Sequence, residues 1–124
     1  MTTDKALLDG ACVLVVEDDF YQAYDTEAAL VDAGAAVLGP FASTAEALER
    51  LNTSTPDCAV LDVNLGAGAD FQLARTLLAK HIPLVFVTGY EASVLPRDLR
   101  QGLTLQKPIA AGALVAAVAS LLKR

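Results

Sequence analysis

Side chains that can bind a metal ion or take part in a reaction follow several short apolar runs of this 124-residue chain. The pair Glu17 and Asp18 follows one run, and Asp62 ends a second. Thr88 ends a third run, and Lys107 follows a fourth. Grouped carboxylates bind a hard cation such as Mg²⁺. An aspartate beside that cation can attack a phosphoryl group, and a lysine stabilises the charge that develops on the phosphoryl oxygens. Brought together, these residues would form a phosphoryl-transfer site.

The apolar runs alternate with segments of helical periodicity. Strands are predicted at Cys12–Val16, Ala35–Leu38, Cys58–Asp62, Leu84–Thr88 and Leu103–Gln106, and helices at Tyr21–Ala33, Thr44–Asn52, Asp70–His81 and Ile109–Leu122. Gly34 marks a helix stop, and Ser43 or Thr44 can cap the next helix. This alternation predicts an α/β fold with a doubly wound, five-stranded parallel sheet of order 2-1-3-4-5. The segment 89–102 contains Pro96 between glycines, so the fourth helix is expected to be short or disordered.

The sheet explains how the residues meet. Ligands of open parallel sheets bind outside the carboxyl ends of the strands. The first and third strands are neighbours in the expected order, which places Glu17, Asp18 and Asp62 together. Three carboxylates in one shallow cleft repel one another unless a cation compensates, and Mg²⁺ is the intracellular candidate.

Composition narrows the functional classes. The chain is 54% hydrophobic with a formal net charge of −6 and no lysine or arginine cluster, so nucleic-acid binding is not expected. No signal peptide is recognised, and the near-apolar run 109–122 is too short for a membrane span. Cys12 and Cys58 form no metal-ligand pattern and are interpreted as buried reduced thiols. We therefore expect a cytoplasmic protein.

Four short motifs together resemble the response-regulator receiver family, over Val13 to Leu122 and in the expected order. They are Val15-Val16-Glu17-Asp18, Leu61-Asp62-Val63-Asn64, Val87-Thr88-Gly89 and Lys107-Pro108. The resemblance implies a flavodoxin-like fold and one receiver domain over 1–124, with its core at 12–122 and no output domain.

By this resemblance, Asp62 is the phosphoacceptor and Lys107 its ion-pair partner. Asp18 binds Mg²⁺ directly, Glu17 acts through water, and the Asn64 carbonyl is a further metal ligand. Thr88 is the switch hydroxyl. Asp19, one place beyond the acidic pair, is interpreted as a helix N-cap.

The string Phe86 to Tyr90 is similar to the FATGUY signature of a receiver subgroup that has a weak fourth helix. Thr104 stands where most receivers carry an aromatic residue, so Tyr90 or Phe86 is expected to substitute in the switch. The loop 65–68 lacks the proline common in the family. Tyr90 and Asn64 are expected to flank the site and control the access of water.

The resemblance also implies partners. The phosphodonor is a phosphohistidine on a sensor histidine kinase or a histidine phosphotransfer protein. The output is an altered contact with a downstream protein target, or a phosphate sink, and the chain is not an enzyme beyond self-catalysed phosphorylation and dephosphorylation. The last helix has a core stripe at Leu114, Val118 and Leu121. Its charge-free opposite side at Ala113, Ala116, Ala117 and Ser120 suggests a partner or homodimer contact, or simple packing against a loop.

Three alternatives stay open at this stage. A pseudo-receiver would bind partners without phosphorylation. A haloacid-dehalogenase-type phosphatase also uses an aspartate nucleophile, but it usually has an acid where this chain has Asn64. A flavodoxin-like flavin binder is disfavoured because Glu17, Asp18 and Asp19 would repel a phosphate.

Overall fold

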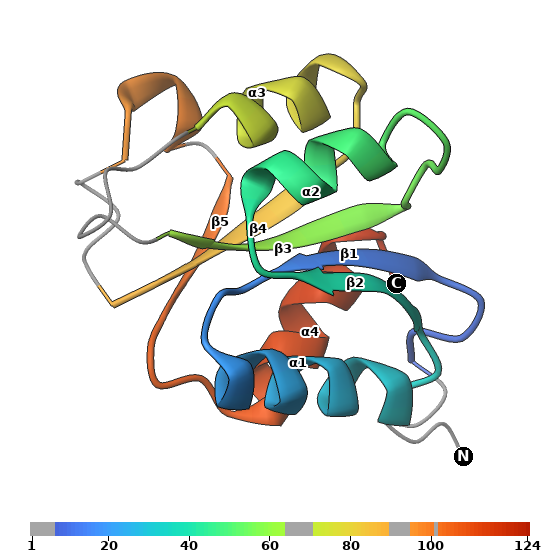
Figure 1. The fold of residues 1–124 in the computed structure, drawn as a ribbon. Helices are drawn as coiled ribbons and strands as arrows, with labels where there is room; N and C mark the ends of the chain where they lie inside the picture. Colours follow the sequence, from blue (N-terminus) through green and yellow to red (C-terminus); the bar gives the residue numbers. More distant parts are fainter. Residues whose placement is uncertain (1–6, 64–70, 90–94, 101) are drawn as a thin grey trace.

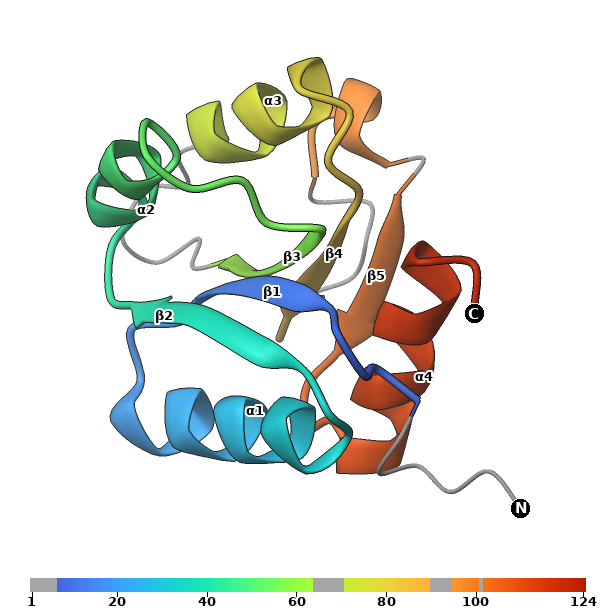
Figure 2. The same cartoon turned by 90° about the vertical axis from the view of Figure 1, so that its right-hand side faces the viewer.

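The computed structural model describes residues 7–63, 71–89, 95–100 and 102–124. Five strands form one parallel sheet in the order β2-β1-β3-β4-β5. The helices α1 and α4 cover one face of the sheet, and α2 and α3 cover the other (Figure 1). In the turned view, β2 and β5 lie at the two edges (Figure 2). The elements are β1 (Cys12–Val16), α1 (Phe20–Asp32), β2 (Ala36–Phe41), α2 (Thr44–Arg50), β3 (Cys58–Val63), α3 (Gln72–Ala79), β4 (Leu84–Thr88), the 3-10 helix η4 (Arg97–Leu99), β5 (Leu103–Gln106) and α4 (Ala111–Leu121).

The predicted fold class, a doubly wound parallel sheet of order 2-1-3-4-5, is confirmed. The bounds of β1, β4 and β5 agree with the sequence prediction, whereas β2 extends to Phe41 instead of ending at Leu38. Gly39 and Pro40 lie inside this strand, and the pairing register with β1 shifts between Leu14 and Val16. Glycine and proline normally end a strand, but an edge strand with a register shift accommodates them.

The segment between β4 and β5 holds little helix in its described part. It contains only the three-residue η4, which follows Pro96. Leu95 and Leu99 are 1% and 2% exposed and pack into the core on the α2–α3 side. The described part thus agrees with a short fourth helix, while 90–94 and 101 lie outside the described residues.

Two apolar clusters hold the helices on the sheet. Phe86 from β4 packs with Leu73 and Leu77 of α3 in the first cluster. In the second, strand residues pack with α1 and α4, and Leu30 and Val118 are fully buried. Alternate residues of β1, β3 and β4 enter opposite clusters, so these three strands are fixed from both faces.

The helix termini carry the expected local signals. The Ser43 hydroxyl accepts a hydrogen bond from the Glu46 backbone N–H at 3.2 Å, so Ser43 rather than Thr44 caps α2. Gly34 follows α1 with a φ of +102°, a conformation that favours glycine and ends the helix.

The predicted core stripe of α4 is confirmed for Leu114 and Val118, which are buried, while Leu121 is half-buried. On the other side, Ala113, Ala116 and Ser120 are exposed and Ala117 is half-buried. A partner or homodimer contact there stays a prediction.

The two cysteines differ in environment. Cys58 is buried, and burial together with the Asp57 charge raises the pKa of its thiol to about 12. Cys12 is only half-buried, contrary to the sequence interpretation, and the same two causes raise the pKa of its thiol. Raised thiol pKa values leave little reactive thiolate at neutral pH. Separately, no helix within the described residues combines the length and apolar character needed to cross a bilayer.

The core assignment predicts a sharp contrast between adjacent leucines of α3. Leu77 is fully buried and Leu78 is 43% exposed. Leu77→Ala should lower the free energy of unfolding by about 2–5 kcal/mol through loss of apolar contacts and a residual cavity. The matched Leu78→Ala change should cost less than about 1 kcal/mol. Urea denaturation of both variants measures this, and equal costs would contradict the assigned face of α3.

Candidate functional site

Strand pairing places the predicted site residues at one edge of the sheet. Val16 of β1 pairs with Leu61 of β3. The residues that follow this pair, Glu17 and Asp62, therefore lie side by side. Thr88 ends β4 and pairs with Gln106 of β5, directly before Lys107. Residues from four chain segments therefore converge at the carboxyl ends of the strands, as the sequence predicted.

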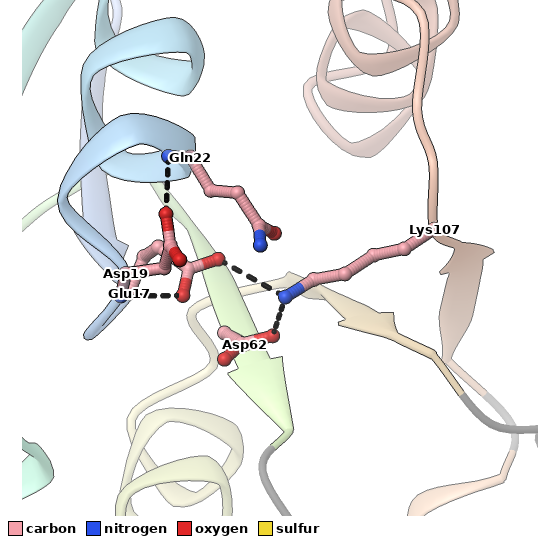
Figure 3. A network of polar contacts seen from close by, with 5 residues as sticks. All are labelled: Glu17, Asp19, Gln22, Asp62 and Lys107. Carbon is pink, nitrogen blue, oxygen red and sulfur yellow. Dashed lines mark hydrogen bonds and ion pairs between the residues drawn. The ribbon is translucent and has the colours of Figure 1, made fainter.

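Lys107 joins two of the acids. Its Nζ atom lies 2.7 Å from Asp62 Oδ1 and 3.3 Å from Glu17 Oε1. Figure 3 shows both carboxylates pointing toward the ammonium, which approaches from the segment after β5. The side chains of Asp62 and Glu17 are 8% and 6% exposed, against 25% for Lys107. Such limited exposure weakens solvent screening of these charges.

Glu17, Asp18 and Asp62 form a carboxylate cluster. Each offers one oxygen, and these three oxygens lie within 4.8 Å of one another. Asp62 Oδ1 is buried and accepts no well-directed hydrogen bond, although it has the Lys107 ion pair. Oxygen ligands on one octahedral Mg²⁺ lie about 3–4 Å apart, at about 2.1 Å from the ion. The donor set therefore fits a hard divalent cation with only small side-chain rotations.

The backbone at the start of α1 orients Glu17. Its Oε2 accepts a hydrogen bond from the Asp19 backbone N–H at 3.1 Å. Asp19 in turn accepts from the Gln22 backbone N–H at 2.9 Å and is the N-cap of α1 (Figure 3). The predicted capping role of Asp19 is confirmed, and the same residue also holds a neighbouring acid in place.

The pKa of the Glu17 carboxyl is raised from 4.5 to about 7. Burial is the main cause and the Asp62 charge adds to it, whereas the hydrogen bond from the Asp19 N–H and the nearby Lys107 lower the pKa. For Lys107, burial lowers the pKa, but the hydrogen bond and charge of Asp62 and the charge of Glu17 outweigh it. The net effect is a raised pKa, so the Lys107 side chain stays a charged ammonium.

The structure describes five of the seven predicted site residues. Thr88 is fully buried, and its carbonyl accepts a hydrogen bond from the Lys107 backbone N–H at 2.8 Å, which ties β4 to the lysine. The peptide bond between Lys107 and Pro108 is cis. Asn64 and Tyr90 lie outside the described residues, so their predicted metal and switch roles stay predictions.

The sequence interpretation did not predict the ion pair between Lys107 and Glu17. It pairs Lys107 with Asp62, and the structure adds an ion pair between Lys107 and Glu17, 90 positions away. No local sequence signal reports such a contact, because it depends on where the segment after β5 passes the end of β1.

Comparison with known proteins identifies the family. Residues 13–119 match the model of the response regulator receiver domain. The chain belongs to this family. Nodulation protein W of Bradyrhizobium diazoefficiens is 32% identical over 119 residues, which cover 92% of this chain and 52% of that protein. The chain thus spans about half the length of that relative.

Solved structures agree with the family and the fold. The solution structure of SdrG from Sphingomonas melonis Fr1 has a TM-score of 0.78 and 33% identity, covering 90% of this chain and 96% of that one. A response regulator receiver protein from Sinorhizobium medicae WSM419 has a TM-score of 0.78 and 27% identity, with 94% and 97% covered. The BeF3-activated conformation of SdrG, from Pseudomonas melonis Fr1, has a TM-score of 0.77 and 34% identity, with 90% and 95% covered.

The raised pKa of Glu17 predicts a pH-dependent stability in metal-free protein. The folded state binds the Glu17 proton more tightly than the unfolded chain, whose carboxyl titrates near its ordinary 4.5. This contribution is complete below the unfolded pKa and is lost as the pH rises toward about 7. Relative to Glu17→Gln, the wild-type free energy of unfolding should therefore fall across this window. Urea denaturation with a chelator measures the difference, and the exposed acid Glu49, changed to Gln, serves as control. A pH-independent difference would contradict the raised pKa.

The carboxylate cluster predicts stabilisation by Mg²⁺. At about 100 times its Kd, the ion should add about 2.7 kcal/mol to the free energy of unfolding through mass action. Asp18→Asn removes the exposed carboxylate of the cluster and should weaken the effect, whereas Glu49→Gln should retain it. Thermal unfolding and amide NMR titration with Mg²⁺ are the measurements. Unchanged stability and unchanged amide shifts in the wild type would exclude the metal site.

Proposed function

We propose that this receiver accepts a phosphoryl group from a phosphohistidine onto Asp62, with Mg²⁺ bound beside it. One observation carries the proposal: Lys107 Nζ lies 2.7 Å from Asp62 Oδ1 while carboxylate oxygens of Glu17, Asp18 and Asp62 gather within 4.8 Å. The Asp62 carboxylate as nucleophile, the Lys107 ammonium and a group of oxygen ligands for a metal ion thus lie together in one site. The family membership supports the same assignment.

The transfer balances as follows. An oxygen of the Asp62 carboxylate attacks phosphorus and forms an acyl phosphate. The phosphorus–nitrogen bond of the donor breaks, and the imidazole nitrogen keeps the electron pair and takes up a proton. Later attack by water on phosphorus releases phosphate and restores the carboxylate. Under this proposal the chain is a phosphoacceptor that catalyses its own reactions rather than an enzyme acting on other substrates.

Each side chain has a defined part. The Lys107 ammonium, which Asp62 and Glu17 hold in place, moves from the free carboxylate to the new phosphoryl oxygens. Asp18 would bind the Mg²⁺ directly and Glu17 through water, with the Asn64 carbonyl as a further ligand. The bound ion would neutralise phosphoryl charge and lessen the repulsion between the acids. Thr88, at the end of β4, and Tyr90 would communicate the new charge to the rest of the domain.

We further propose that the signal leaves through a changed contact with a protein target, or that the domain drains phosphoryl groups from a pathway. A pseudo-receiver that needs no phosphorylation is the second candidate. The convergence of acids and lysine gives it no support, because a module that only binds partners has no need to assemble buried like charges.

Phosphorylation by a small phosphodonor tests the proposal. With Mg²⁺ and acetyl phosphate, the intact mass should increase by one phosphoryl group. Asp62→Asn should abolish the increase, and Lys107→Ala should slow it at least about tenfold, since it removes a fixed cation at the developing charge.

Asp57→Asn is the matched control, because Asp57 lies at the opposite end of β3 and accepts a hydrogen bond from the Cys12 backbone N–H. It should be phosphorylated like the wild type. Failure of the wild type to gain the group, or labelling that survives Asp62→Asn, would refute the assignment and favour the pseudo-receiver.

A further inference from the structure

The Gln22 side chain lies at the edge of the phosphoacceptor site. Figure 3 shows its carboxamide pointing from α1 toward the Glu17 carboxylate and the Lys107 ammonium. All three side chains line one cavity of about 510 Å³, and Gln22 itself is exposed. Gln22 therefore places an uncharged group, which both donates and accepts hydrogen bonds, beside two charged groups of the site.

The space around this carboxamide is large enough for water. The cavity adjoins a second one of about 560 Å³ between α1 and α4, with Asp25 in both linings and Asp32 in the second. One water molecule occupies about 30 Å³ in the liquid, so several have room beside the site.

The local structure of the helix does not use the carboxamide. Gln22 is the third residue of α1, where a glutamine side chain in a capping box accepts from the N-cap backbone N–H. Here the N–H of the N-cap, Asp19, donates to Glu17 Oε2 at 3.1 Å instead. The part of Gln22 that joins the cap is its backbone N–H, 2.9 Å from Asp19 Oδ1. Among the described residues the carboxamide has no hydrogen-bond partner, so it is available to water.

The other polar groups of the lining are less suited to hold a neutral water molecule at the site. Glu17 and Lys107 already engage each other in an ion pair. The Asp25 carboxylate is charged and repels a phosphoryl group. Thr26 lies about one turn farther along α1 than Gln22. Gln22 is thus the neutral polar side chain that the start of α1 presents to this cavity.

We propose that Gln22 positions the water molecule that hydrolyses the phosphoryl group on Asp62, an inference that rests on the proposed function. Water attacks phosphorus roughly in line with the bond to Asp62, from the side opposite that bond. In Figure 3 the Lys107 ammonium lies between the Asp62 carboxylate and the Gln22 carboxamide. The carbonyl oxygen of Gln22 accepts a hydrogen bond from the water and orients its lone pair toward phosphorus.

The reaction balances without a further reactant. The water oxygen forms a bond to phosphorus, and the bond between phosphorus and the Asp62 oxygen breaks. Its electron pair returns to the Asp62 carboxylate, and a proton of the water passes to the released phosphate or to solvent. Gln22 neither gains nor loses a proton, so its contribution is orientation of the water alone.

The decay of the acyl phosphate tests the inference. Acetyl phosphate with Mg²⁺ loads the protein, desalting removes the donor, and intact mass then follows loss of the phosphoryl group in Mg²⁺ buffer. Gln22→Ala should slow this loss about tenfold, because the water is no longer oriented. Gln22→Met keeps the side-chain length without the hydrogen bond and should be slowed as much. Both variants should be loaded at the wild-type rate, since loading uses no water.

Thr26→Val is the matched control, because it removes a hydroxyl from the same cavity, about one turn farther along α1. Its phosphoryl group should decay at the wild-type rate. The backbone N–H that joins the cap of α1 stays in every Gln22 variant, so urea denaturation should give the wild-type midpoint. Slowed decay that occurs only with a lowered midpoint would mark a structural role and overturn the proposal.

The outcomes separate the two proposals. A wild type that gains no phosphoryl group refutes the proposed function. Normal loading with unchanged decay in Gln22→Ala refutes only the role of Gln22. Faster decay in Gln22→Ala also overturns it, in favour of a side chain that shields the site from water. Wild-type decay in Gln22→Met, or equal slowing of loading and decay, overturns it as well, because the side chain then acts through its volume or by binding the phosphoryl group.

Discussion

The ion pairing of Lys107 with Asp62 and Glu17 is the interaction on which the site depends. Three carboxylates at the end of a sheet repel one another, and poor solvation of two of them raises the cost. One ammonium offsets part of this repulsion, but the pKa of Glu17 is still raised, mainly by burial and further by the Asp62 charge. A cluster of three carboxylates of this kind offers the oxygen ligands that a hard divalent cation prefers.

The parallel sheet makes such crowding tolerable. Each polar side chain of the site lies at the end of a strand or directly after it. The residues of β4 are all buried, whereas those of the edge strand β5 are half-buried or exposed. The apolar contacts of the two core clusters fix the strand ends, so the polar residues cannot relax away from one another.

The start of α1 connects the site with the surface. Asp19 caps the helix and donates its backbone N–H to Glu17, so the helix and the buried acid are fixed by the same residue. The exposed aromatic rings of α1 begin at the next position, Phe20. The exposed face of α1 thus belongs to an element that is hydrogen-bonded directly to the acidic cluster.

The sequence by itself determined the strand order, the bounds of β1, β4 and β5, the capping by Asp19 and the convergence of Glu17, Asp18, Asp62, Thr88 and Lys107. These features follow from apolar periodicity and from the rule that parallel strands present their carboxyl ends at one edge. The tertiary structure decided that β2 continues through Gly39 and Pro40, that Lys107 pairs with Glu17, and that α1 and α4 leave an acidic groove between them. Each of these depends on how segments far apart in the chain pack in three dimensions, and local periodicity carries no record of such distances.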